Sequence, residues 1–206
     1  MKSKYYHEIH NTYCWETWCK KYINENLLDN VNSELIVHEV GPDIIEFPLF
    51  TPKFCEEIIN LCNKVGWLDN KETGLETICK FLHDIKLHDI YSRVLKEFVY
   101  PIWIDFWSLD SSRYSDLDHG SYLIKYKKKN RKALNPHHDR SLITMNLRLN
   151  EDFLGGGTKI IGHNKIYEPK NIGSVICHPG RVTHLHGGCP VEKGTRYVLI
   201  SLTEMS

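Results

Sequence analysis

The sequence predicts an α+β fold in which amphipathic helices come first and pack on one face of an antiparallel β core. Two stretches of the first half, at about 51–64 and 88–106, have apolar residues at helical spacing. From Ser121 onward, short β-rich segments alternate with Gly, Pro and Asn, which is typical of an antiparallel sandwich or barrel. No repeat or Pro/Gly/Ser-rich linker divides the chain. We therefore expect a single domain over 1–206.

The first part of the chain, residues 1–120, is expected to be mainly helical support. Residues 12–28 place Trp15 and Trp18 at helical spacing, and such aromatic stripes usually belong to a core. The segment IIEFPLF at 44–50 is typical of a short strand.

The next two helices have clearer boundaries. Thr51 can cap a helix that has Pro52 in its first turn, and the apolar pattern continues to about Lys64. A second long helix is expected over 88–106, where Pro101 kinks or splits it because proline lacks the backbone N–H.

The second part, residues 121–206, is expected to form the β core. Turn residues separate its apolar segments at short intervals. The expected strands are SYLIKYK (121–127), LITMNLRL (142–149), GTKII (157–161), KIYEP (165–169), GSVICHP (173–179) and GTRYVLISL (194–202).

The charge balance limits the classes of partner. Lys and Arg number 26 and Asp and Glu number 26, so the chain has no net field to hold nucleic acid or an anionic membrane. No apolar run approaches the roughly 20 residues that span a bilayer. The N-terminal segment is too charged for a signal peptide. We expect neither nucleic acid nor a membrane span.

The seven cysteines do not form a recognisable metal or redox motif. No pair has C-x-x-C spacing, and the odd number leaves at least one thiol unpaired within the chain. Most are expected to be small buried hydrophobic residues. A Cys14–Cys19 disulfide is compatible with the spacing but is not required by it.

A cluster of histidines carries the chemistry. Six of the 12 His fall between His137 and His186. In the segment NPHHD, His137 and Asp139 are two residues apart, so on a strand they face the same point. His184 or His186 could complete a triangle with them. Two His and one carboxylate that leave positions open form the metal site of non-haem Fe(II) oxygenases, whereas structural zinc sites are closed.

Arg196 extends this arrangement. It begins an apolar strand and shares a face with Val198, Ile200 and Leu202. A guanidinium there needs a carboxylate partner, because a buried unpaired charge is costly. A dicarboxylate such as 2-oxoglutarate could chelate the metal at one end and pair with Arg196 at the other. The alternative is that these residues form an ordinary surface pair, a loop histidine and a salt bridge.

The neighbouring residues have simpler interpretations. His138 should point away from His137 and be exposed or support the site from behind. His184 is the rival third ligand, and the ten-residue offset to Arg196 favours His186. His178 is expected in a structural turn. Gly155–Gly157 lacks the Lys-Ser/Thr and the helix of a phosphate loop, so a tight turn or bulge is expected.

Several segments together resemble a known enzyme family. NPHHDRSLITMNLRLN, FLGGGTKI, GSVICHPGRVTHLHGG and KGTRYVLISL resemble the C-terminal catalytic domain of procollagen-lysine 2-oxoglutarate 5-dioxygenases, the collagen lysyl hydroxylases. The resemblance extends upstream to WCKKYINEN and PDIIEFPLFTPKFCEEI. It therefore covers nearly the whole chain. The family's domain is the last part of a longer polypeptide.

The resemblance implies a double-stranded β-helix (jelly-roll) with helices packed on one sheet, and it implies residue roles. His137, Asp139 and His186 match the iron ligands. Arg196 matches the residue that binds the far carboxylate of 2-oxoglutarate. Tyr126 and Asn146 match positions that line the cosubstrate pocket.

The sequence departs from the family near that pocket. Thr158 stands where animal members carry Cys, and Gly187 and Cys189 replace an acidic and a larger apolar residue. Val198 stands where several related dioxygenases have a Ser that donates to the carboxylate. The changes at Thr158, Gly187 and Cys189 affect the expected peptide selectivity more than the iron chemistry.

The implied function is hydroxylation of lysine in collagen-like Gly-X-Lys sequences, which gives 5-hydroxylysine, succinate and CO₂. The implied cofactors and cosubstrates are Fe(II), 2-oxoglutarate, O₂ and ascorbate. The alternatives are a prolyl or other protein hydroxylase of the same chemistry, or a non-catalytic metal-binding assembly module. A collagen-like peptide and a second copy of the chain, in a homodimer, are the expected partners.

The composition also bears on the source of the chain. The chain has no Gln and one Ala, and Ile, Asn and Lys abound, as in proteins from AT-rich genomes. With the resemblance, this suggests a giant-virus member. Its location would then be a viral or host compartment, or the endoplasmic reticulum lumen where animal relatives work.

Two charged segments remain. The run KYKKKNRK at 125–132 is interpreted as a solvated hairpin loop, with nucleic-acid binding or a flank of the peptide groove as alternatives. Asp105, Asp110, Asp116 and Asp118 are interpreted as a solvated loop that could also attract a basic lysyl substrate.

Overall fold

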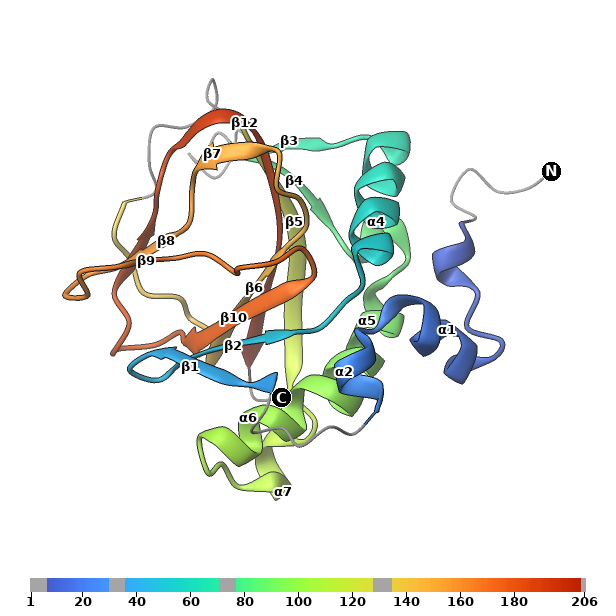
Figure 1. Cartoon of the computed structure of the whole chain (residues 1–206), viewed down its shortest axis with the longest axis horizontal. Helices are drawn as coiled ribbons and strands as arrows, with labels where there is room; N and C mark the ends of the chain where they lie inside the picture. Colours follow the sequence, from blue (N-terminus) through green and yellow to red (C-terminus); the bar gives the residue numbers. More distant parts are fainter. Residues whose placement is uncertain (1–6, 30–35, 71–76, 128–134, 205–206) are drawn as a thin grey trace.

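The computed structural model describes residues 7–29, 36–70, 77–127 and 135–204. Two antiparallel sheets enclose a cavity, and helices cover the outer face of the larger sheet (Figure 1). The strands are β1 (His38–Gly41), β2 (Ile44–Pro48), β3 (Leu68–Asn70), β4 (Thr77–Phe81), β5 (Asp118–Lys127), β6 (Ile143–Arg148), β7 (Phe153–Gly155), β8 (Thr158–Ile160), β9 (Ile166–Tyr167), β10 (Ser174–Pro179), β11 (His186–Gly188) and β12 (Val191–Glu204).

The larger sheet has the order β1-β2-β10-β6-β12-β5-β4-β3, with β7 paired to β12. The smaller sheet has the order β11-β8-β9. Strand β12 is central: it pairs with β5 from Thr195 to Glu204 and with β6 from Val198 to Thr203. This is the jelly-roll arrangement with helices on one face that the sequence and its resemblance predicted.

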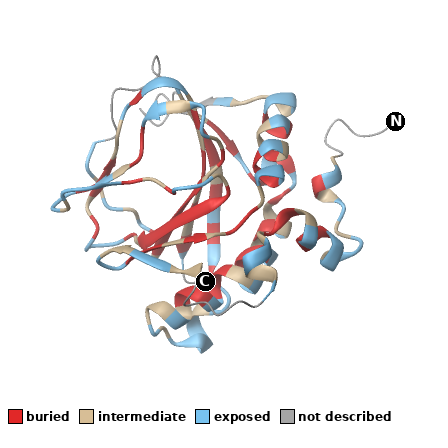
Figure 2. Cartoon of the chain, viewed as in Figure 1, coloured by how far each residue is buried: buried red, intermediate tan, exposed pale blue. Residues whose placement is uncertain are grey.

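Strand β6 of the larger sheet separates two environments. In β6, Met145 and Leu147 belong to the buried core shared with the helices, whereas Thr144 and Asn146 face the cavity between the sheets. The alternation follows from the period of two along a strand. Figure 2 shows the buried residues gathered where the helices meet the sheet. The helix side therefore supplies stability and the other side supplies the cavity.

The helices that cover the sheet are α1 (Trp15–Tyr22), α2 (Glu25–Leu28), α4 (Pro52–Val65), α5 (His88–Val94), α6 (Tyr100–Phe106) and α7 (Ser111–Tyr114). Short 3-10 turns occupy Glu8–His10 and His83–Ile85. Helix α4 begins as predicted, with the Thr51 side chain accepting a hydrogen bond from the N–H of Phe54 at 3.4 Å and Pro52 in the first turn.

The predicted helix over 12–28 is interrupted. Ile23 forms an isolated antiparallel bridge with Phe50, and the N–H of Asn24 donates to the carbonyl oxygen of Leu49 at 2.9 Å. These tertiary hydrogen bonds compete with the helical ones at this point. The result is two short helices, α1 and α2, with Asn24 capping the second.

The long helix over 88–106 is continuous in its backbone but changes its winding. A π-helical turn, Leu95–Val99, joins α5 to α6 just before Pro101. Proline lacks an N–H and its ring collides with the carbonyl of a regular α-helix, so a wider turn relieves the conflict. The predicted effect of Pro101 is therefore a local change of helix type.

The first 120 residues contain more β structure than expected. Strand β2 matches the predicted segment, but β1, β3 and β4 were not predicted. They extend the larger sheet at both of its edges. Their sequences are short and partly polar, which gave little periodic signal. In the described part of the chain, no helix is long and apolar enough to cross a membrane.

The seven cysteines, all within the described residues, are free thiols. The Cys14–Cys19 disulfide that the spacing allowed is not formed. Burial raises the pKa of the Cys62 thiol to about 12 and also raises the pKa values of Cys55 and Cys177. These thiols act as small core residues, as expected.

The close contact of Gly173, just before β10, with Leu49 and Phe50, just after β2, can be tested by mutation. The carbonyl oxygen of Gly173 accepts hydrogen bonds from the N–H groups of Leu49 and Phe50, and its own N–H donates to Arg148, each at 2.9 Å. Its φ is +82°, and an added Cβ would collide with the carbonyl oxygen of Phe50. Gly173→Ala should lower the free energy of unfolding by about 2 kcal/mol or more in urea denaturation.

Gly120→Ala is the matched control, because a Cβ at Gly120 would meet nothing within 4 Å. It should leave the urea midpoint almost unchanged. Equal stability of the two variants would contradict the role assigned to Gly173.

Candidate metal centre

Two separate segments meet at the wall of the cavity. His137 lies in the segment that precedes β6, and His186 begins β11. The N–H of His137 donates to the carbonyl oxygen of His186 at 2.8 Å, and the N–H of His186 donates back at 3.0 Å. A third bond, from the N–H of Asp139 to the carbonyl oxygen of Gly180 at 3.1 Å, fixes the next part of the segment.

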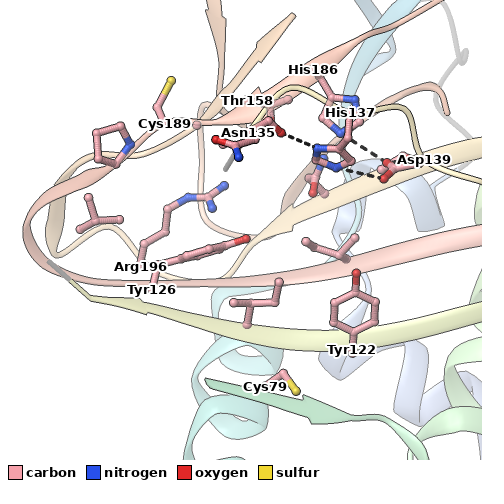
Figure 3. Close-up of a pocket in the computed structure, with 18 of the residues that line it drawn as sticks. Cys79, Tyr122, Tyr126, Asn135, His137, Asp139, Thr158, His186, Cys189 and Arg196 are labelled. Atoms are coloured by element: carbon pink, nitrogen blue, oxygen red, sulfur yellow. Dashed lines mark hydrogen bonds and ion pairs between the residues drawn. The ribbon is translucent and has the colours of Figure 1, made fainter. Parts of the chain in front are cut away.

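His137, Asp139 and His186 are thereby brought together, as the sequence predicted. Their potential ligand atoms all lie within 4.8 Å of one another. Nε2 of His137 is 3.4 Å from one carboxylate oxygen of Asp139, and Nε2 of His186 is 3.4 Å from the other (Figure 3). The side chains of Asp139 and His186 are largely buried, at 13% and 8% exposure, whereas that of His137 is 35% exposed.

Hydrogen bonds to backbone carbonyls select the tautomer of both histidines. Nδ1 of His137 lies 2.8 Å from the carbonyl oxygen of Asn135, and Nδ1 of His186 lies 2.9 Å from that of His184. A carbonyl oxygen can only accept, so each Nδ1 carries the proton. Each Nε2 is then a lone-pair donor directed at the common point, which is the orientation found in metal-binding histidines.

Asp139 is held as a carboxylate. Thr144 Oγ1 donates to its Oδ2 at 2.6 Å, and Ser141 Oγ lies 2.7 Å from Thr144 Oγ1. Burial raises the pKa of Asp139, but the adjacent His137 side chain, the hydrogen bond from Thr144 and the nearby His186 outweigh it and lower the pKa overall. Burial lowers the pKa of His186. Ionised carboxylate and neutral imidazole are the forms that bind metals.

The donor set fits a metal of the Fe(II) type. Two imidazole nitrogens and one carboxylate on a shared face leave positions open, which suits non-haem Fe(II). A closed structural zinc site would need a fourth protein ligand. Among the described residues, no other group of His, Cys, Asp or Glu side chains has metal-binding geometry.

The triad opens onto a cavity of about 620 Å³ between the two sheets. The predicted pocket residues Tyr126, Asn146 and Arg196 all line it. Figure 3 shows the Arg196 guanidinium above the Tyr126 ring and on the same side of the larger sheet as the triad. Its central carbon lies 5.5 Å from the centroid of that ring, and the side chain is almost fully buried.

The other histidines take different roles. His138 is exposed, as expected. Both ring nitrogens of His184 are engaged elsewhere, with Thr183 Oγ1 at 2.8 Å and the carbonyl oxygen of Pro42 at 3.1 Å, so His184 does not compete with His186. His178 lies within β10 and not in a turn; its ring packs 4.9 Å from that of His186. Burial lowers the pKa of His178 to about 4, so it is neutral.

Sequence reasoning missed several residues of the site. Thr144 supports Asp139, and its position two residues before Asn146 on one strand could have revealed it. Tyr122 also lines the cavity, and Figure 3 shows its hydroxyl directed toward the triad. Glu168 pairs with Arg196, and no pattern in the sequence signals that contact.

The glycine run forms a tight turn, as predicted. Gly155, Gly156 and Gly157 all have positive φ and join β7 to β8. A Cβ on Gly156 would lie 2.8 Å from Cδ of Arg196. The turn therefore lets the backbone approach the Arg196 side chain closely, which only glycine allows.

Two of the four departures from the family pattern lie at the pocket, as expected, whereas Gly187 and Val198 are not among the residues that line it. Thr158 and Cys189 line the cavity.

Of the two charged segments, the structure describes the acidic side chains fully and the basic run only in part. In the basic run, residues 128–132 lie outside the described part of the chain, so the hairpin interpretation is untested. The acidic side chains Asp105, Asp110, Asp116 and Asp118 are exposed and none lines the cavity.

Comparison with curated proteins decides the family. The chain is 32% identical over 201 residues to human procollagen-lysine,2-oxoglutarate 5-dioxygenase 2, covering 91% of this chain and 27% of that protein. It is 32% identical over 203 residues to mouse procollagen-lysine,2-oxoglutarate 5-dioxygenase 1, again covering 27% of that protein. The chain belongs to the 2-oxoglutarate-dependent dioxygenases related to procollagen-lysine 5-dioxygenase. No protein-family model matches it.

This lysyl hydroxylase homologue spans about a quarter of the length of those relatives. Solved structures of similar fold include a viral collagen prolyl hydroxylase from Paramecium Bursaria Chlorella virus-1, with a TM-score of 0.54, 16% identity and coverage of 79% of this chain and 96% of that one. A Pseudomonas putida prolyl-4-hydroxylase has a TM-score of 0.57 at 13% identity, with 80% and 93% coverage. These likenesses establish the 2-oxoglutarate–Fe(II) oxygenase fold.

The support of Asp139 by Thr144 can be tested by metal binding. Thr144→Val removes the hydrogen bond to the carboxylate at almost constant volume. The affinity for Fe(II), measured by anaerobic titration, should fall by about tenfold or more, as is typical when an outer partner of a ligand is removed. Thr158→Val is the control, because Thr158 lines the same cavity and makes no side-chain hydrogen bond to Asp139. Equal Fe(II) affinity in both variants would contradict this role.

Proposed function

We propose that this chain is an Fe(II)- and 2-oxoglutarate-dependent hydroxylase of lysine in collagen-like Gly-X-Lys sequences. The observation that carries the proposal is the placement of His137, Asp139 and His186 in one cavity with the buried guanidinium of Arg196. The homology to procollagen-lysine 5-dioxygenases supports both the chemistry and the choice of lysine.

In this proposal the triad holds the iron. Nε2 of His137, Nε2 of His186 and the carboxylate of Asp139 are its protein ligands. Bound Fe(II) supplies the oxidation chemistry, with O₂ and 2-oxoglutarate as cosubstrates and succinate and CO₂ as products. Thr144 keeps the carboxylate ionised, and the backbone carbonyls of Asn135 and His184 keep both imidazoles in the correct tautomer.

Arg196 anchors the far carboxylate of 2-oxoglutarate. Its buried position in the same cavity as the triad orients a dicarboxylate with its keto-acid end toward the metal. Tyr126 and Asn146 line the same space and are assigned to cosubstrate binding. The apolar side chains of Ile124, Ile200 and Leu202 limit the access of water to it.

The lysine specificity rests on the relatives and not on a residue seen in the cavity. The fold neighbours include two prolyl hydroxylases, so hydroxylation of proline or of another protein side chain is the alternative. A non-catalytic metal-binding module is disfavoured by the intact triad and the buried Arg196. A homodimer, a requirement for ascorbate, a viral source and an endoplasmic reticulum or viral compartment stay predictions.

The decisive experiment uses peptides that differ only in the target residue. The protein, Fe(II), 2-oxoglutarate and ascorbate are incubated with a collagen-like Gly-X-Lys peptide or its proline counterpart. Mass spectrometry should show one added oxygen on lysine, with an equivalent amount of succinate. Oxidation of the proline peptide alone would replace lysine by proline in the proposal. Succinate without oxidation of either peptide would leave the dioxygenase and exclude both substrates.

The ligand assignment has its own test. His137→Ala, Asp139→Ala and His186→Ala should each abolish peptide oxidation and weaken Fe(II) binding, because two remaining protein ligands hold the metal poorly. His138→Ala, on the exposed side of the same segment, is the matched control and should keep both properties. Full activity in any of the three variants would remove that residue from the ligand set.

Arg196→Ala should act on the cosubstrate. Loss of the guanidinium removes the charge-assisted hydrogen bonds to the far carboxylate, so the KM for 2-oxoglutarate should rise by about tenfold or more. The KM for the peptide should change little. An unchanged KM for 2-oxoglutarate would show that another residue anchors the dicarboxylate.

A further inference from the structure

The Arg196 guanidinium already has a carboxylate partner within the chain. Nε of Arg196 donates to Oε1 of Glu168 at 3.0 Å, and Nη2 donates to Oε2 at 2.7 Å. This is a bidentate pair on one edge of the guanidinium, the strongest geometry for such a contact. The Arg196 side chain is 8% exposed and that of Glu168 is 20% exposed, so water screens the pair only partly.

The pair is built into the fold from three directions. Glu168 follows β9 directly, and the carbonyl oxygen of the next residue, Pro169, accepts a hydrogen bond from Arg148 at 2.9 Å. Gly156 leaves room for the Arg196 side chain, and Tyr126 lies against its guanidinium. Arg196 lines the cavity but Glu168 does not, so the carboxylate approaches the guanidinium from behind the cavity wall.

This placement changes the electrostatics of the cosubstrate pocket. A dicarboxylate that enters the cavity meets an arginine whose charge Glu168 offsets. It must share the guanidinium with Glu168, at the cost of repulsion between the two carboxylates, or displace Glu168 toward solvent. Lys127, at the exposed end of β5, is the other cation among the described cavity residues and does not contact this pair.

We propose that Glu168 sets the affinity for the dicarboxylate cosubstrate by offsetting the charge of Arg196. The inference rests on the proposed function, which assigns Arg196 to the far carboxylate of 2-oxoglutarate. Glu168 contacts neither the metal ligands nor the cavity, so it acts through Arg196 as a positioning and tuning residue. The affinity of the site for 2-oxoglutarate is therefore lower than the arginine alone would give.

Glu168→Gln separates charge from shape. The amide keeps the size of the side chain and one oxygen acceptor for Arg196, but it removes the negative charge. Calorimetry of the Fe(II)-loaded protein with 2-oxoglutarate under nitrogen should give a Kd about three- to tenfold lower than that of the wild type. In steady-state assays the KM for 2-oxoglutarate should fall with little change in kcat.

The salt dependence is a second readout. In Glu168→Gln the arginine charge is no longer offset, so the Kd for 2-oxoglutarate should rise more steeply with added NaCl than in the wild type. Glu192→Gln is the matched control, because Glu192 lies beside the same glycine turn without an ion pair to Arg196. It should change neither the Kd nor its salt dependence.

Two outcomes would overturn the inference while leaving the proposed function intact. A higher Kd in Glu168→Gln would show that the carboxylate orients Arg196 for the cosubstrate. An unchanged Kd and salt dependence would show that the pair is only structural. If the wild-type protein itself does not bind 2-oxoglutarate, the proposed function fails first. Thermal melts of all variants identify any loss of folding.

Discussion

Two reciprocal backbone hydrogen bonds between His137 and His186 constrain the whole candidate site. They join segments that lie far apart in the chain, and the bond from Asp139 to Gly180 extends the junction by a further step. The side chains of the triad are therefore directed by main-chain pairing. The folded main chain itself thus brings the three ligand atoms within 4.8 Å of one another.

The larger sheet links this junction to the hydrophobic core. Along β12, Leu199 packs toward the helices while Arg196 and Ile200 face the cavity. The neighbouring β6 repeats the division with Met145 on one side and Thr144 on the other. The strands that bury apolar surface against the helices also carry the polar groups of the cavity. Because the core is closely packed, it holds these strands, and with them the polar groups, in fixed positions.

The sequence predicted the parts of the molecule that depend on local pattern. Period-two alternation directed His137 and Asp139 to a common point; the resemblance placed Asn146 in the pocket, and the same alternation along β6 would then have found Thr144. Prediction from the sequence failed where contacts between distant segments determine the local structure. The bridge from Ile23 to Phe50 breaks a segment with good helical spacing, and the pairing of Arg196 with Glu168 depends on how β9 lies across the smaller sheet. Contacts of this kind have no signature in the flanking residues.

The burial of the cysteines has a consequence for the chemistry that this fold is suited to host. A thiol reacts as its thiolate, and burial strongly disfavours that form at Cys55, Cys62 and Cys177. Oxidants would therefore react slowly with these three buried thiols.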